Sequence, residues 1–158
     1  MEKEYFMKEA LKEANKADKK LEVPVGVVIV KDDTIIARAY NQKESKNSPI
    51  KHAEITAIEK ACKKLNNWRL NDCDMYITLE PCAMCAGAII NSRIRKIYIG
   101  AMEHNSGACG SKLNLLQDYD FETKVEIENG VMQEECQKIL KSFFKEIRNT
   151  KAKNKGEN

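Results

Sequence analysis

The chain has 158 residues, of which 42% are hydrophobic and 32% are charged. This length is typical of one domain and allows a core to form without disulfide bridges. The longest apolar stretch, residues 23–30, is much shorter than the roughly 20 residues of a transmembrane helix, so we expect no membrane contact. The first ten residues mix acids and bases and contain no apolar signal segment, so we expect a cytoplasmic protein.

The charges are unevenly distributed along the chain. The formal net charge is +3, from 27 basic and 24 acidic residues. Residues 141–158 hold six bases and two acids, a net charge of +4, which leaves −1 for residues 1–140. The total is too small to indicate a nucleic-acid-binding protein by itself. Its concentration at the C-terminal end nevertheless suits contacts with phosphate groups.

Hydrophobic periodicity predicts the secondary structure in chain order. Residues 5–21 fit an amphipathic helix, and residues 22–30 and 34–40 fit a β-hairpin whose first strand is buried on both faces. The next helix carries an apolar stripe made of Ile55, Ile58, Cys62 and Leu65. The other expected elements are a loop over 41–50, strands over 75–79, 95–100 and 123–127, a short helix ending at 90, a loop over 101–111, a helical turn at 113–116, a long helix over 131–148 and a polar tail from 151.

The central order of strand, helix, strand, helix and strand predicts an α/β fold with helices on both faces of one sheet. The sequence contains no internal repeat and no linker rich in Pro, Gly or Ser. We therefore expect one domain over residues 1–150, followed by a disordered basic tail over residues 151–158.

Two short fragments carry residues suited to metal chemistry: His52-Ala53-Glu54 and Pro81-Cys82-Ala83-Met84-Cys85, each at the start of a predicted helix. Cys82 and Cys85 project from the same side of a helical turn, where the helix dipole favours their thiolate forms. Two sulfurs and one imidazole leave the fourth position of a tetrahedral zinc site open, which is the catalytic arrangement. Glu54 is placed to accept a proton from a zinc-bound water.

The cysteine pair has two plainer interpretations, a redox pair or half of a structural zinc site. A second Cys-x-x-Cys that would complete a four-sulfur site is absent from the sequence, and the strand order is not that of a thioredoxin-like protein. The pair together with a His-x-Glu, in a chain with only two histidines, favours a catalytic zinc site. Of the other cysteines, Cys62 is interpreted as a core residue and Cys73, Cys109 and Cys136 as reduced and unpaired.

Characteristic segments run through nearly the whole chain: Glu22-Val-Pro-Val-Gly26, His52-Ala-Glu-Ile55, Trp68-Arg-Leu70, Thr78-Leu-Glu-Pro-Cys-Ala-Met-Cys-Ala-Gly-Ala-Ile89, Ser92-Arg-Ile94, Gly107-Ala-Cys-Gly-Ser111 and Phe143-Phe144. In these segments the sequence resembles the cytidine deaminase-like superfamily, and more closely its bacterial tRNA-specific adenosine deaminases. The resemblance implies a three-layer α/β/α fold with a central mixed five-stranded sheet, a homodimer, and one Zn²⁺ per subunit.

The same resemblance implies a reaction and the residues that perform it. Adenosine at the wobble position of a tRNA anticodon is deaminated to inosine, when zinc-bound hydroxide attacks C6 of the base. His52, Cys82 and Cys85 would hold the zinc, and Glu54 would shuttle protons.

Further residues are implied as substrate contacts. Asn41 would hydrogen-bond the flipped base, and the peptide at Ala53 would help to read it. Glu103 and Arg148 are additional candidate contacts. The expected partner is an anticodon stem-loop, because the target amine cannot be reached inside a base stack. Phe143 and Phe144 are adjacent and cannot share one helix face, so one of them is expected to reach the RNA or the dimer surface.

Two loops depart from the family pattern. Ser48-Pro49 stands where relatives usually carry Asp-Pro, and Glu103-His104-Asn105-Ser106 stands where they commonly carry an Asp and then a Lys. Both loops are expected to face RNA, so the departures concern nucleotide contacts and leave the zinc chemistry unchanged. His104 is interpreted as a solvated loop residue, with a metal-binding or RNA-stacking role as the alternative.

Two other functions stay open at this point. The first is a guanine deaminase, or another free-base or nucleoside deaminase of the same superfamily, which residues 55–58, 60–63 and 103–104 resemble in part. The second is a structural-zinc or redox module that binds RNA without catalysis. That module would make Glu54 dispensable and would close the fourth metal position.

Overall fold

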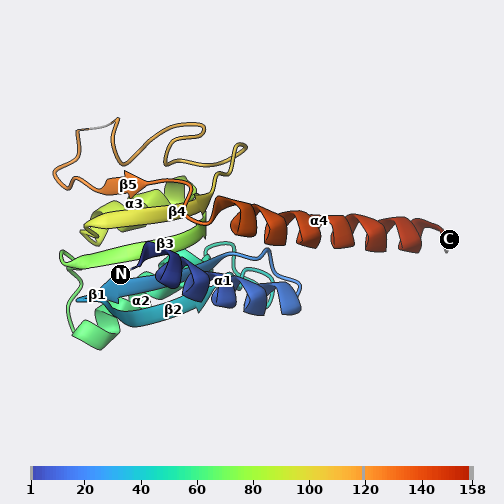
Figure 1. Ribbon diagram of the computed structural model, residues 1–158, viewed down its shortest axis with the longest axis horizontal. Helices are drawn as coiled ribbons and strands as arrows, with labels where there is room; N and C mark the ends of the chain where they lie inside the picture. The colour runs from blue at the N-terminus through green and yellow to red at the C-terminus, as the bar shows by residue number, and fades with distance from the viewer. Residues whose placement is uncertain (1, 119, 157–158) are drawn as a thin grey trace.

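Five strands form one mixed sheet in the computed structural model, which describes residues 2–118 and 120–156 (Figure 1). The strand order is β2-β1-β3-β4-β5, with β1 antiparallel to both β2 and β3, and with β3, β4 and β5 mutually parallel. In chain order the elements are α1 (Lys3–Lys19), β1 (Gly26–Lys31), β2 (Thr34–Tyr40), α2 (Ala53–Leu65), β3 (Cys73–Leu79), α3 (Ala83–Asn91), β4 (Lys96–Ala101), β5 (Glu126–Glu128) and α4 (Gln133–Gly156).

The helices cover both faces of the sheet. Alternate side chains of β1 enter two separate apolar clusters, Val27 and Ile29 on one face and Val28 and Val30 on the other. The first cluster packs against α2 and α3, and the second against α1 and α4. These layers confirm the predicted three-layer α/β/α fold, and the complete burial of β1 on both faces confirms the interpretation of its apolar run.

The buried face of α2 differs from the prediction. Its fully buried apolar residues are Ala53, Ala57 and Ala61, whereas the predicted stripe is only half-buried at Ile55, Ile58, Cys62 and Leu65. Small alanine side chains let the helix lie close to the sheet, and this places the larger residues at the flank of the contact. Cys62 is therefore a flanking residue and not a fully buried core residue.

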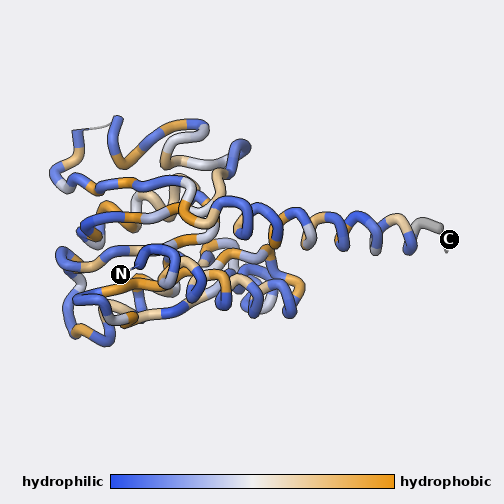
Figure 2. Tube along the Cα trace, in the orientation of Figure 1, coloured by the Kyte–Doolittle hydropathy of each residue, from blue (hydrophilic) through white to orange (hydrophobic). Residues whose placement is uncertain are grey.

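The C-terminal prediction is also wrong in one respect. The sequence predicts a disordered tail from residue 151, but α4 continues through residues 151–156, while residues 157–158 lie outside the described part of the chain. Lys and Ala, which are frequent in this segment, are strong helix formers, and their propensity outweighs the polar composition. Figure 1 shows the second half of α4 projecting beyond the sheet and its other helices, and Figure 2 shows that this half is mainly hydrophilic.

Smaller differences concern the region before α4. The helical turn predicted at 113–116 begins one residue later: Asp118 N–H donates to Asn114 O at 2.9 Å, and Asn114 also forms an isolated bridge with Cys109. The strand predicted over 123–127 is shorter and lies further along the chain, over the three residues of β5. Within the described residues, no helix has the length and apolar character that crossing a membrane requires.

Candidate metal centre and active site

The first residues of α2 and α3 lie close together, and a predicted metal ligand lies at the start of each helix. His52 is the N-cap residue of α2 and Cys82 is the N-cap residue of α3, and neither side chain makes a capping hydrogen bond. Cys85 lies in the first turn of α3 and is fully buried. Because the capping residues do not use their side chains for the helix ends, His52 Nδ1 and Cys82 Sγ are available as ligands.

The spacing of these three side chains fits a tetrahedral zinc ion. His52 Nδ1 lies 3.7 Å from Cys82 Sγ and 3.5 Å from Cys85 Sγ, and the three ligand atoms all lie within 4.8 Å of one another. Zn–S and Zn–N bonds of about 2.3 and 2.1 Å in a tetrahedron put neighbouring ligand atoms about 3.6 Å apart. No other His, Cys, Asp or Glu cluster of metal-binding spacing occurs among residues 2–118 and 120–156.

The electrostatics of the cluster favour one thiolate. Hydrogen bonds from the Cys85 thiol and from His52 lower the pKa of Cys82 to about 3, although burial opposes them. The hydrogen bond with Cys82 raises the pKa of His52, against the effects of burial and of the positive charge of Lys43. The hydrogen bond with Cys82 has the largest effect on the pKa of Cys85 and raises it, and burial raises it further. Zinc binds thiolate and neutral imidazole, so metal binding at this cluster releases protons.

Glu54 is a buried carboxyl group beside the metal cluster. It lies in the first turn of α2 and is 4% exposed. Burial raises its pKa, while hydrogen bonds with its own backbone N–H and with the Cys85 thiol act in the opposite direction. A carboxyl pKa that burial raises is typical of groups that act in acid–base catalysis.

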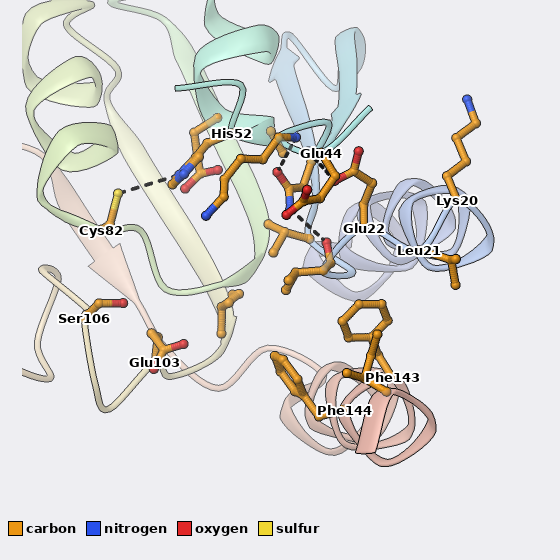
Figure 3. A pocket seen from close by; sticks show the side chains of 18 of the residues that line it. Lys20, Leu21, Glu22, Glu44, His52, Cys82, Glu103, Ser106, Phe143 and Phe144 are labelled. Carbon is orange, nitrogen blue, oxygen red and sulfur yellow. Dashed lines mark hydrogen bonds between the residues drawn. The ribbon is translucent and has the colours of Figure 1, made fainter. Parts of the chain in front are cut away.

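A cavity of about 720 Å³ opens next to this cluster. Figure 3 shows His52 and Cys82 on one side of it, Glu103 and Ser106 on a second side, and Phe143 and Phe144 of α4 across from the metal ligands. Leu21, which is 71% exposed and has a positive φ of 60°, completes the rim next to the phenylalanines. The cavity is large enough for a base and part of its neighbours, and its far wall on α4 consists of Phe143, Phe144, Ile147 and Lys151.

The structure brings three of the predicted substrate contacts to this cavity: Asn41, Ala53 and Glu103. The Asn41 amide donates to Val23 O at 3.3 Å and accepts from Lys43 N–H at 3.2 Å, so one N–H and one lone pair remain for a ligand. Ala53 is the first residue of α2, where backbone N–H groups lack partners within the helix.

Arg148 is not part of the cavity wall. It is exposed on α4, whereas Ile147 and Lys151 of the same helix line the cavity. His104 is exposed in its loop, in agreement with a solvated histidine. Phe143 is 5% exposed and Phe144 is 44% exposed, which confirms that the two rings lie on different faces of α4.

Sequence reasoning missed the roles of two buried carboxylates, each of which fixes a loop of the cavity wall. Glu80, which is 3% exposed, accepts hydrogen bonds from the N–H groups of Glu103, Cys109 and Ser111 at 2.9–3.0 Å and from the Ser111 hydroxyl at 2.5 Å. A Cβ on Gly107 would collide with this carboxylate, so the loop passes close to it only because residue 107 is glycine.

Glu22 has the same role on the other side of the cavity. It is fully buried and accepts from the N–H groups of Glu44 and Ser45 at 2.9 and 2.6 Å. An acidic residue directly beside an apolar strand segment is the sequence signal common to Glu22 and Glu80, because a buried charge needs several hydrogen bonds. The sequence does not tell which distant loop supplies them.

Comparison with known proteins agrees with this geometry. Residues 1–101 match the family model described as the cytidine and deoxycytidylate deaminase zinc-binding region. The tRNA-specific adenosine deaminase of Bacillus subtilis (strain 168) is 48% identical over 148 residues, which cover 94% of this chain and 92% of that protein. The tRNA-specific adenosine deaminase of Aquifex aeolicus (strain VF5) is 44% identical over 149 residues, 94% of this chain and 98% of that one.

Solved structures show the same relationship. A structure from a study of A-to-I editing by tRNA:A34 deaminases at the wobble position of transfer RNA superposes with a TM-score of 0.83 at 40% identity, over 86% of this chain and 99% of that chain. The guanine deaminase of Bacillus subtilis superposes with a TM-score of 0.62 at 43% identity, over 65% of this chain and 66% of that chain. The chain therefore belongs to the zinc-binding cytidine and deoxycytidylate deaminase family and, within it, to the tRNA-specific adenosine deaminases.

Proposed function

We propose that this chain is a zinc-dependent hydrolase that converts adenosine to inosine at the wobble position of a tRNA anticodon. The observation that carries the proposal is the cluster of His52, Cys82 and Cys85 at the wall of a base-sized cavity, with buried Glu54 beside it. The identity to tRNA-specific adenosine deaminases over most of the chain supports the choice of substrate.

In this proposal His52, Cys82 and Cys85 hold one zinc ion per chain through one nitrogen and two sulfur atoms. Bound zinc supplies a Lewis acid that makes a water molecule nucleophilic near neutral pH. Three protein ligands are the number found in catalytic zinc sites, where the fourth position stays open.

Glu54 moves the protons. Its carboxylate takes the two protons of the attacking water in turn, and it delivers one to ring N1 and the other to the departing amino group. One water is consumed and one ammonia is released, so C6 exchanges its amino group for an oxygen. Burial keeps the carboxyl in place and holds its pKa above the ordinary range, which suits a group that must alternate between both forms.

The remaining cavity residues orient the base. The free N–H and lone pair of Asn41 and the backbone N–H of Ala53 are the polar groups that would read the purine. Glu103, held through its N–H by Glu80, presents its carboxylate at another side of the cavity. The edited nucleotide must leave the base stack to enter, and an anticodon loop offers such bases at low energetic cost.

Two surfaces bear on the partners. Arg148 and the other exposed basic residues of α4 would contact RNA phosphates. On the opposite layer, half-buried Ile58, Cys62 and Leu65 of α2 and exposed Trp68, which follows the helix, are candidate contacts of a homodimer interface.

A guanine deaminase is the second candidate, because one superposes on this chain. That superposition covers 65% of the chain, against 86% for the tRNA:A34 deaminase structure. The larger coverage favours the RNA substrate.

The test is an inosine assay on an anticodon stem-loop, with guanine, adenosine and cytidine as alternative substrates and zinc-loaded protein. We expect inosine at the wobble position and no ammonia from the small compounds. Glu54→Gln should reduce the rate by at least about 100-fold with zinc content unchanged, whereas Glu59→Gln, an exposed acid on the same helix, should keep full activity. Ammonia release from guanine alone would reject the RNA substrate, and a fully active Glu54→Gln would reject the proton role.

A further inference from the structure

One cation of the cavity wall has no part in the chemistry described above. Three lysines line the cavity: Lys20, Lys43 and Lys151. Lys20 donates to the Tyr40 hydroxyl at 2.5 Å, and Figure 3 shows it pointing away from the cavity. Lys151 belongs to the far wall on α4. Lys43 is the lysine among the three whose charge acts on His52, at the metal end of the cavity.

The backbone of Lys43 is held on both sides. Its N–H donates to Asn41 Oδ1 at 3.2 Å, and its carbonyl accepts from Ser48 N–H at 3.0 Å. The same Asn41 side chain faces the cavity as a candidate contact to the base. The Asn41 side chain and the backbone of Lys43 are therefore joined by a hydrogen bond.

The buried carboxylate of Glu22 fixes the residues that follow. It accepts from the amides of Glu44 and Ser45, next in the chain after Lys43. Burial acts to raise the pKa of Glu22, but these hydrogen bonds and the charge of Lys43 outweigh it and lower the pKa. Lys43 thus has a fixed backbone, while its side chain is exposed and forms no ion pair with any carboxylate in the described part of the chain.

The Lys43 ammonium group has no carboxylate partner among the described residues, and the backbone that carries it is hydrogen-bonded to the Asn41 side chain, the candidate contact to the base. Such a group is suited to bind an anion that accompanies the base. In an RNA, that anion is the phosphodiester next to the flipped nucleotide. Resting on the proposed function, we infer that Lys43 binds a phosphate group adjacent to the edited nucleotide. Lysine is an established point-charge partner of phosphate. The contact favours a nucleotide chain over a free base, because a free base brings no phosphate.

The experiment measures binding of an anticodon stem-loop by the zinc-loaded full chain in a Glu54→Gln background, so that the RNA is not converted. Lys43→Gln should weaken binding about tenfold at low salt and reduce the slope of log K against log salt by about 0.7, the share of one phosphate in single-stranded RNA. Lys46→Gln is the matched control, since Lys46 is exposed in the same loop but does not line the cavity. Lys43→Arg should restore binding.

The phosphate itself is located with stem-loops in which single phosphates near the edited nucleotide are replaced by neutral methylphosphonates. With Lys43 present, one such replacement should weaken binding about tenfold, and with Gln at position 43 the same replacement should have little effect. If every replacement has the same effect in both proteins, or if Lys43→Gln and Lys46→Gln bind equally well, Lys43 does not bind phosphate.

Two further outcomes distinguish a phosphate contact of Lys43 from a purely structural role and from failure of the proposed function. If Lys43→Gln lowers the melting temperature but leaves RNA affinity and the salt slope unchanged, Lys43 only balances the charge of Glu22, and the inference is wrong. If the parent protein with Lys43 neither binds nor edits the stem-loop, the proposed function fails, and the phosphate contact is rejected with it.

Discussion

Cys85 and Cys136 are both fully buried, but their surroundings give them different chemistry. Cys85 lies 3.5 Å from His52 Nδ1 and next to Cys82 and Glu54. Cys136 packs on α4 against Gly100 of β4, where burial raises its pKa to about 12. The first thiol has ligand partners and the second has an apolar environment, so equal burial does not imply an equal role.

Replacing these two cysteines separates metal binding from packing. Cys85→Ala should remove most of the bound zinc, because two protein ligands do not retain the ion as three do. Cys136→Ala should keep the full zinc content and lose about 1 kcal/mol of stability through the small cavity left in the core. Zinc content by atomic emission and thermal melting check both. Equal zinc content in the two variants would remove Cys85 from the ligand set.

The pairing of the two sulfurs could be predicted from the sequence because it is local. Cys82 and Cys85 are three residues apart at the start of α3, a spacing that puts two side chains on the same side. The approach of His52, which lies 30 residues before Cys82, depends on the folded chain. The functions of Glu22 and Glu80 could not be predicted in this way. Each carboxylate meets amides more than 20 residues away, and only the folded chain brings those loops to it.

At the scale of elements, α4 contributes two faces to the molecule. Phe143 is buried against the body, and Phe144 is 44% exposed at the cavity, where Figure 3 shows both rings opposite His52. The rings meet edge-on with centroids 5.3 Å apart. Both rings therefore line the cavity, but Phe143 is also part of the buried fold, whereas Phe144 is the more accessible of the two.

Alanine substitution should mainly affect stability at Phe143 and mainly affect RNA binding at Phe144. Phe143→Ala should lower stability by about 3 kcal/mol, because a large buried ring is lost. Phe144→Ala should change stability by less than about 0.5 kcal/mol but weaken stem-loop binding about tenfold, through loss of base stacking. Chemical denaturation and RNA titration give the two numbers for each variant. If Phe144→Ala binds RNA as tightly as the parent, that ring is not a stacking surface.

Helices and strands could be predicted from the sequence where their apolar residues are also the residues that the fold buries. β1 is apolar at consecutive positions and is buried on both faces. The periodicity also predicts the helix α2, but it points to large residues for the buried face, which Ala57 and Ala61 occupy in the structure. Periodicity locates a helix, whereas the face that approaches a sheet most closely is decided by which side chains are small.

At the scale of the whole molecule, the most basic segment of the chain is also the segment that projects from its body. Residues 141–158 carry a net charge of +4, and Figure 1 shows that the second half of α4 projects beyond the sheet. A predicted disordered tail is instead a helix that continues from the cavity wall, where Lys151 lies. The helix therefore extends from the cavity wall into the projecting half, which includes the basic residues Lys151 and Lys153.

Removing residues 149–158 tests what this projection does. The side chains of residues 149–154 are exposed, so the deletion should leave the melting temperature within about 2 °C of the parent. It removes three lysines, and the slope of log K against log salt for stem-loop binding should fall by at most about 2.7, since each phosphate of a duplex contributes about 0.9. A companion variant with Lys151, Lys153 and Lys155 all changed to Gln keeps the helix length. The same loss of slope in both proteins assigns the effect to charge, and an unchanged slope in both would show that the projecting half of α4 does not meet RNA.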